Sequence, residues 1–208
     1  LGNNEVIGLH SPTAGELTFT RHLWLLRLSQ RVKATRLAQL SQAVVRKIVP
    51  QRTTRKQDME YIRAQRLAFD DPSREAVYRN YAVNLADILA TIRRTSKPAL
   101  LSTVGVNLRD FAPLGSLHRP GLSPAQRSDW ERSYAAGIAA EALGSFEEAI
   151  VHYGNAARID DHFAELQFRL ARCHAAAGKS GVARRHFDLA RDWDALQFRA
   201  DGRINSLI

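Results

Sequence analysis

The chain has 208 residues, of which 45% are hydrophobic and 25% charged, as in ordinary globular proteins with a packed core. Its single cysteine, Cys173, excludes an internal disulfide framework and leaves the compartment open. No run of the sequence approaches the roughly 20 consecutive apolar residues that a membrane-spanning helix requires.

The formal net charge of +9 is concentrated in the first part of the chain. Residues 1–120 carry 19 Lys/Arg against 9 Asp/Glu, whereas residues 121–208 carry 11 against 12. Such an asymmetry is compatible with an anionic partner, either nucleic acid or a membrane surface. We do not expect nucleic-acid binding, because no recognised nucleic-acid-binding fold or base-stacking motif accompanies the charge.

The first residues, LGNNE, have the chemistry of a strand end that passes into a loop. Gly2 permits a tight backbone bend, and Asn3 and Asn4 tolerate unusual backbone angles while offering side-chain amides. A simple turn is the alternative interpretation, and these residues by themselves favour it.

Residues 19–48 show apolar positions at helical spacing with basic residues between them, and a break is expected near Ala34–Thr35. The apolar stripe of such a basic amphipathic helix usually packs on its own domain, and we favour this interpretation. A helix that lies on a membrane surface is the alternative.

A further helix or helical turn is expected over residues 59–69, followed by a second, stronger helix signal. Asp71 is expected to cap this second helix, and Pro72 suits its first position. The basic residues Arg93 and Arg94 favour its carboxyl end, and Lys97-Pro98 stops it.

The run from Ala99 to Val106 contains no charge and is bounded by breakers, which predicts a strand buried on both faces. Helix, loop and buried strand in succession are typical of an α/β layer with a parallel strand. Asn4 and Asn107 both follow inferred strands, at the edge where open α/β sheets bind ligands. Asn107 is therefore a candidate for the rim of an active site.

Residues 130–163 and 164–196 align at a period of 34 residues without a gap. A glycine stands at the fifteenth position of each segment, between two expected helices. Small or aromatic residues recur at four further positions, namely Gly137 and Ala171, Ala149 and Ala183, Tyr153 and Phe187, and Ala156 and Ala190. The period and these positions resemble the tetratricopeptide repeat, in which small residues let paired helices approach closely.

The tetratricopeptide resemblance implies all-α helical hairpins over residues 124–196, with residues 197–208 as a continuation helix. It also implies a concave groove for a protein or peptide partner, although a helical insertion docked on the rest of the chain is the alternative. The first helix of each hairpin would line such a groove. The candidate partner-binding residues are Tyr134, Ile138, Phe168 and Arg172.

No motif for a metal or a cofactor is evident in the sequence. The histidines are scattered without a His-x-x-x-His pair, and there is no glycine-rich phosphate loop, so we expect neither a metal nor a cofactor. His118 lies two residues from Ser116 and is a weak candidate for catalysis.

Gly2-Asn3-Asn4-Glu5 resembles the third conserved block of the SGNH (GDSL-like) hydrolases, usually Gly-x-Asn-Asp. Together with VNLRD, LHRPGLSPAQRSDWER and the tandem repeats, it is similar to a bacterial subgroup with tetratricopeptide helices inserted in an SGNH-type domain. The resemblance implies a partial flavodoxin-like α/β domain over residues 1–120. It implies Asn4 as an amide donor of an oxyanion hole and Gly2 as the loop-shaping residue, whereas Glu5 stands where the family has Asp.

The Gly-Asp-Ser and Asp-x-x-His blocks of that family are absent from the chain, so we expect a fragment that lacks the catalytic serine and histidine. The resemblance implies that the complete protein hydrolyses or transfers an ester or acyl group, with a carbohydrate ester as one candidate substrate. This chain would then be inactive. The alternative is a non-enzymatic tetratricopeptide scaffold that holds a protein partner.

Overall fold

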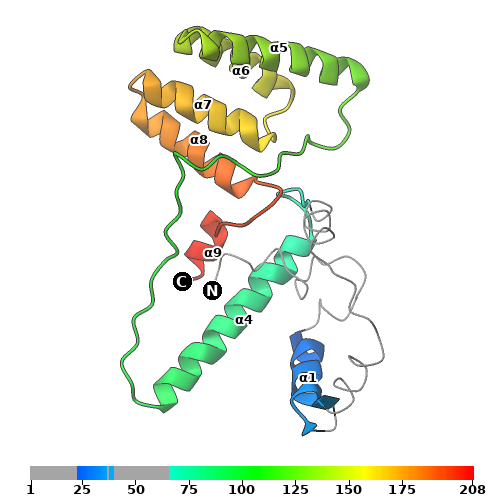
Figure 1. The fold of residues 1–208 in the computed structure, drawn as a ribbon, viewed down its shortest axis with the longest axis vertical. Coiled ribbons are helices and arrows are strands. Elements are labelled where there is room, and N and C mark those ends of the chain that lie inside the picture. The colour runs from blue at the N-terminus through cyan, green and yellow to red at the C-terminus, as the bar shows by residue number, and fades with distance from the viewer. Residues whose placement is uncertain (1–22, 37, 40–65) are drawn as a thin grey trace. The chain divides into compact units, whose positions relative to one another are not determined.

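The computed structural model describes residues 23–36, 38–39 and 66–208 (Figure 1). The chain divides into two compact units. One contains residues 66–71 and 98–208, and the other contains α1 (Leu23–Lys33) and α4 (Ser73–Arg94).

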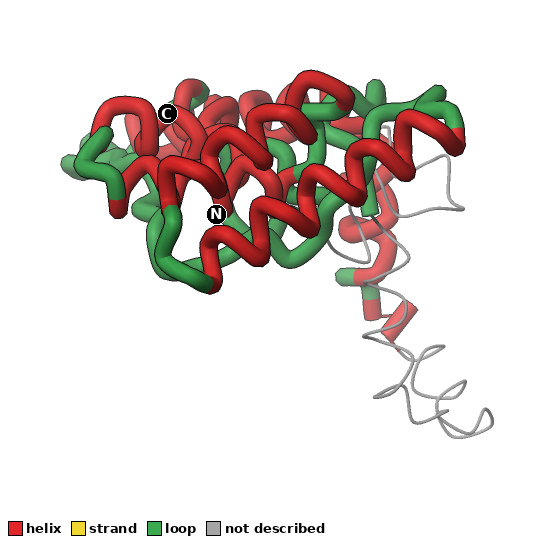
Figure 2. Tube along the Cα trace, turned by 90° about the horizontal axis from the view of Figure 1, so that it is seen from above, coloured by secondary structure: helices red, strands yellow, loops and turns green. Residues whose placement is uncertain are grey.

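The prediction of an α/β layer is wrong for the described residues, which contain helices and loops and no strand (Figure 2). The error came from residues 97–108, which run without a turn or bend but pair with no strand in the part of the chain that the structure describes. Leu100 and Leu101 are 96% and 42% exposed, so this segment is not buried on both faces. An uncharged apolar run indicates an extended backbone, but only neighbouring strands would bury it.

In the unit that contains α1 and α4, α1 ends at Lys33, and a turn follows at Ala34, near the expected break. Arg27 of α1 donates to Asn84 Oδ1 of α4 at 2.9 Å and pairs with Asp87 Oδ2 at 2.6 Å. None of the described helices is both long enough and apolar enough to cross a bilayer.

The helix α4 begins one residue later than expected, with Pro72 rather than Asp71 at the N-cap. The helix predicted over residues 59–69 is also wrong where the structure describes it. Residues 66–68 are irregular and Phe69 begins a turn, while residues 59–65 lie outside the described part of the chain. The backbone N–H of Leu67 donates to Ala195 O at 3.1 Å, which ties this irregular segment to the carboxyl-terminal part of its unit.

The carboxyl-terminal part of the chain forms two helical hairpins in sequence (Figure 1). The four helices are α5 (Pro124–Ala142), α6 (Phe146–Ile159), α7 (Ala164–Ala176) and α8 (Ser180–Asp192). Helix α5 packs on α6, α7 packs on α8, and α6 joins the two hairpins through α7. Ser123 starts α5 with a capping box, in which its side chain and that of Gln126 each accept from the other residue's backbone N–H.

The residues that recur at the 34-residue period occupy equivalent places in the two hairpins. Gly144 and Gly178 lie between the paired helices with φ of +74° and +75°, a conformation that favours glycine. The paired small and aromatic positions are all buried, namely Gly137 and Ala171, Ala149 and Ala183, Tyr153 and Phe187, and Ala156 and Ala190. The periodicity therefore predicted the core of the hairpins correctly.

A second repeated feature, a buried aspartate, follows the last helix of each hairpin. Asp160 and Asp194 stand 34 residues apart and are 1% and 2% exposed. Asp160 accepts from His118 Nδ1 at 2.7 Å and from the Arg119 backbone N–H at 3.3 Å. The Asp194 carboxylate accepts from the backbone N–H groups of Leu114 and Gly115 at 3.0 and 2.9 Å. Each hairpin thus binds part of the segment that precedes α5.

The continuation helix expected over residues 197–208 is wrong in extent. Helix α9 covers only Gly202–Ser206, where the Asp201 side chain accepts from the Ile204 backbone N–H at 2.7 Å. The residues before it are irregular, and they follow two residues whose backbone N–H groups donate to groups outside a helix. The backbone N–H of Leu196 donates to Asp194 Oδ1 at 3.0 Å, and that of Ala195 donates to Gly115 O at 2.9 Å.

Candidate functional site

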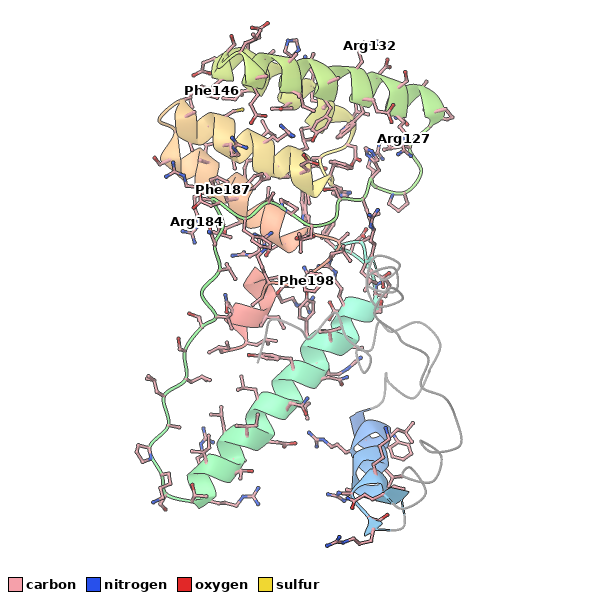
Figure 3. The ribbon with its side chains drawn as sticks, in the orientation of Figure 1. Arg127, Arg132, Phe146, Arg184, Phe187 and Phe198 are labelled. Atoms are coloured by element: carbon pink, nitrogen blue, oxygen red, sulfur yellow. The ribbon has the colours of Figure 1, made fainter. Side chains whose placement is uncertain are left out.

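The candidate site is a groove of about 850 Å³ along the hairpins. We call this surface the hairpin groove. It is lined by α5, the start of α6, α7, α8 and a loop before α5, through residues Arg109, Asp110, Ala112, Ile138, Glu141, Ala142, Phe146, Phe168, Arg169, Arg172, Ala175, Ala176 and Phe187. Phe146 and Phe187 lie on the same side of the hairpins, at the left of the view in Figure 3.

Glu141 is the electrostatic centre of the groove. Its Oε2 accepts from Tyr153 OH at 2.7 Å and from Arg169 Nη1 at 2.9 Å. Arg169 also binds Glu165 Oε1 and donates to Tyr134 OH at 3.1 Å. These bonds join three of the four hairpin helices and hold the charges of Glu141 and Arg169 in fixed places.

The pKa values of Tyr134, Tyr153 and Arg169 favour fixed protonation states near neutral pH. Burial, with a contribution from Glu165, raises the pKa of Tyr134 to about 12, so its hydroxyl keeps its proton. Burial and the hydrogen bond to Glu141 raise the pKa of Tyr153 in the same way. Burial lowers the pKa of Arg169, but the hydrogen bond to Glu141 and the contributions of Tyr134 and Tyr153 together outweigh burial, so the pKa rises. We therefore assign these three side chains, with Glu141, to a structural network of hydrogen bonds and ion pairs.

The four predicted partner-binding residues lie in three different places: two at the open surface of the groove, one at its floor and one outside it. Ile138 and Arg172 line the groove with side chains open to solvent. Phe168 is 7% exposed and forms the groove floor as part of a core cluster with Phe187. Tyr134 does not line the groove. It stacks on Trp130 with ring centroids 4.7 Å apart, inside the packing of the first hairpin.

Sequence reasoning missed Glu141, Arg169 and Phe146. Glu141 and Arg169 lie three residues from Ile138 and Arg172 respectively, so they share one face of α5 and one face of α7. Extending the helical spacing by one turn from the two predicted residues would have found both. Nothing in the repeat pattern indicated that Phe146, the first residue of α6, would reach the groove.

The predicted oxyanion-hole residues Gly2, Asn4 and Glu5 lie outside the described residues, so that assignment stays a prediction. Asn107, the rim candidate, is exposed, and its Oδ1 accepts from the Asp110 backbone N–H at 2.9 Å. This side chain thus shapes a local turn.

Ser116 and His118 are not joined as a nucleophile and its base. Ser116 Oγ accepts from the Glu165 backbone N–H at 2.9 Å, at the start of α7. His118 Nδ1 lies 2.7 Å from Asp160 Oδ2. Both side chains fasten the segment before α5 to the hairpins.

Asp160, Asp161 and His162 are the one group in the described part of the chain whose ligand atoms lie close enough to hold a metal, within 4.8 Å of one another. Both Asp160 oxygens already accept hydrogen bonds, Oδ2 from His118 and Arg119 and Oδ1 from the His162 backbone N–H at 3.1 Å. We assign these side chains a structural role.

We expect His186 to make the second hairpin sensitive to acid. Its ring stacks on His174 with centroids 5.3 Å apart, and its Nδ1 lies 2.7 Å from Gln167 Oε1. Burial, together with His174 and Arg185, lowers the pKa of His186 from 6.5 to about 4. Burial and Lys179 lower the pKa of His174 as well.

We expect the free energy of unfolding to fall as the pH is lowered from 6.5 to 4, because the unfolded chain then binds protons that the folded chain does not. Allowing for the partial exposure of the ring, the loss is on the order of 1–2 kcal/mol. Urea unfolding at several pH values measures it. His186→Gln keeps an amide donor for Gln167 and should flatten this dependence; an equally steep profile in that variant would contradict the assignment.

Comparisons with known proteins give this chain no relative: no protein-family profile, no curated protein and no solved structure matches it.

Proposed function

We propose that the two hairpins form a protein-interaction module that binds an extended segment of a partner protein in the hairpin groove. The observation that carries this proposal is the composition of the groove. Ile138 and Phe146 are 37% and 36% exposed beside the open guanidinium of Arg172. Exposed apolar side chains next to a few polar groups are typical of binding surfaces.

The charges of the groove favour a segment that combines apolar residues with an acidic one. Glu141 is 10% exposed and satisfied by Tyr153 and Arg169, so it offers little negative charge to a ligand. Arg172 is 59% exposed, and its contact with Glu141 is long at 3.9 Å. A carboxylate of the partner would find an available guanidinium there.

The tetratricopeptide resemblance supports the proposal through the repeated spacing of the two hairpins. We do not propose acyl hydrolysis, because the predicted oxyanion-hole residues Gly2, Asn4 and Glu5 lie outside the described part of the chain and that part contains no α/β layer. A non-enzymatic interaction module is the function that the described residues support best.

A random library of 12-residue peptides, selected against the whole chain, provides the ligand for the test. We expect selected peptides to bind with micromolar dissociation constants and to lose at least about tenfold in affinity when Ile138 is replaced by aspartate, because the charge desolvates poorly in an apolar contact. Val151→Asp is the matched control, since Val151 is 62% exposed on α6 and does not line the groove. Equal affinity for the two variants, or no selected peptide, would refute the proposal.

A further inference from the structure

One face of α1 carries three large apolar side chains that are open to solvent. Trp24, Leu28 and Val32 are 64%, 50% and 54% exposed. They follow one another at intervals of four residues, so they form a stripe along one face of the helix, which we call the α1 stripe. The contacts of α1 with α4 are made by Arg27 instead. The expectation that the apolar stripe of this helix packs on its own domain is therefore wrong for these three side chains.

The polar side chains near the α1 stripe are basic. Arg31 stands three residues after Leu28, beside the stripe, and Lys33 and Arg36 follow it. All three are exposed, and none of them pairs with a carboxylate in the part of the chain that the structure describes. The sequence of residues 17–57 contains ten Lys/Arg and no Asp/Glu. This part of the chain therefore places an excess of positive charge next to exposed apolar groups.

We propose that α1 lies on the surface of an anionic membrane, with the α1 stripe at the boundary between the lipid headgroups and the acyl chains. Trp24 suits this boundary, where tryptophan is enriched in membrane proteins. The aliphatic part of Arg31 would lie along the stripe while its guanidinium reaches a lipid phosphate. The 11 residues of α1 are about 16 Å long, roughly half the thickness of the hydrocarbon core, so the helix lies in the plane of the surface.

The combination of charge and apolar surface favours a membrane over other anionic partners. A nucleic acid would neutralise the basic side chains but would leave the α1 stripe without a partner. A protein partner would gain little from three side chains, because stable protein interfaces bury a much larger area. A membrane accepts a narrow apolar face and adds the attraction of its anionic lipids for Lys and Arg. This proposal is independent of the hairpin groove, which lies in the other compact unit.

The test is co-sedimentation of the whole chain with phosphatidylcholine vesicles that contain roughly 30% phosphatidylserine, compared with vesicles of phosphatidylcholine alone. We expect at least about tenfold stronger binding to the anionic vesicles. Leu28→Asp should weaken this binding at least about tenfold, because it places a charge in the apolar layer. Val151→Asp is the matched control, since it makes the same change at a 62% exposed side chain of α6, and it should bind as the native chain does.

The fluorescence of Trp24 tests whether α1 itself enters the lipid boundary. Trp24 is 64% exposed, so its emission should shift to shorter wavelengths when the chain binds anionic vesicles, whereas Trp130 is only 3% exposed and already apolar in its surroundings. Trp24→Phe keeps an apolar side chain, so this variant should still bind but should lose the shift.

Absence of binding to the anionic vesicles would overturn the proposal. So would equal binding by Leu28→Asp and Val151→Asp, or a fluorescence shift that persists in Trp24→Phe. Binding to heparin without binding to vesicles would overturn it in favour of a polyanion such as nucleic acid.

Discussion

Replacing Asp194 by alanine is expected to lower the free energy of unfolding by about 3–5 kcal/mol, the largest effect that we expect from a single substitution in this chain. The buried carboxylate accepts from the backbone N–H groups of Leu114, Gly115 and Leu196 and lies 3.4 Å from Arg199 Nη2. Alanine would leave these donors without a partner. Burial raises the pKa of Asp194, and the three backbone donors partly offset that rise.

Urea unfolding followed by circular dichroism measures this loss. Asp129→Ala is the control, because Asp129 is 57% exposed and its ion-pair partner among the described residues is Arg132 on the same helix. The free energy lost in this variant should stay within about 0.5 kcal/mol. Asp194→Asn keeps one acceptor oxygen, so the free energy of unfolding that it loses should lie between the losses of Asp194→Ala and Asp129→Ala. If Asp194→Ala unfolds at the same urea concentration as Asp129→Ala, the carboxylate does not hold the segment before α5.

The second large effect is expected at Gly137, on the face of α5 that packs against α6. A Cβ at this position would lie 2.4 Å from Cδ1 and Cε1 of the fully buried Tyr153. Gly137→Ala should therefore cost about 1–3 kcal/mol through overpacking, net of the roughly 1 kcal/mol by which alanine favours a helix over glycine.

Gly154→Ala is the matched control, because Gly154 lies within α6 and a Cβ there would meet nothing within 4 Å. This variant should be as stable as the native chain or more stable by up to about 1 kcal/mol. Thermal unfolding should thus show a lower midpoint for Gly137→Ala and an unchanged or higher midpoint for Gly154→Ala. Two equal shifts would mean that the contact between α5 and Tyr153 is not what requires glycine.

The hairpins were predictable from the sequence because their signal is local and occurs twice. Gly144 and Gly178 mark the turns, and the small residues facing Tyr153 and Phe187 mark the close helix contacts. The same alignment places Asp160 and Asp194 at equivalent positions. The binding of a distant segment by these carboxylates is a tertiary property that spacing alone does not reveal.

The segment from Ala99 to Asp110 shows why the rest could not be predicted. Its composition predicts a buried strand, whereas residues 99–108 are irregular, because strand pairing and burial depend on neighbours that a single stretch does not specify. In the described part of the chain it is bonded by the side chains of Asn205, which is 101 residues away from Val104, and of Arg199, which is 92 residues away from Asn107. The residues of the groove were only partly predicted for a similar reason. Tyr134 was expected to line the groove, but it stacks on Trp130, a neighbour that helical spacing alone does not specify.

Amide hydrogen exchange of the whole chain with and without a selected 12-residue peptide tests the central claim, that the hairpin groove binds a partner segment. Amides of α5 near Ile138 and of α7 near Arg172 should gain protection, because a bound peptide stabilises the folded groove. The exposed face of α6 around Val151 should gain least. Protection confined to regions away from α5 and α7, or equal protection of the α6 face, would contradict the account.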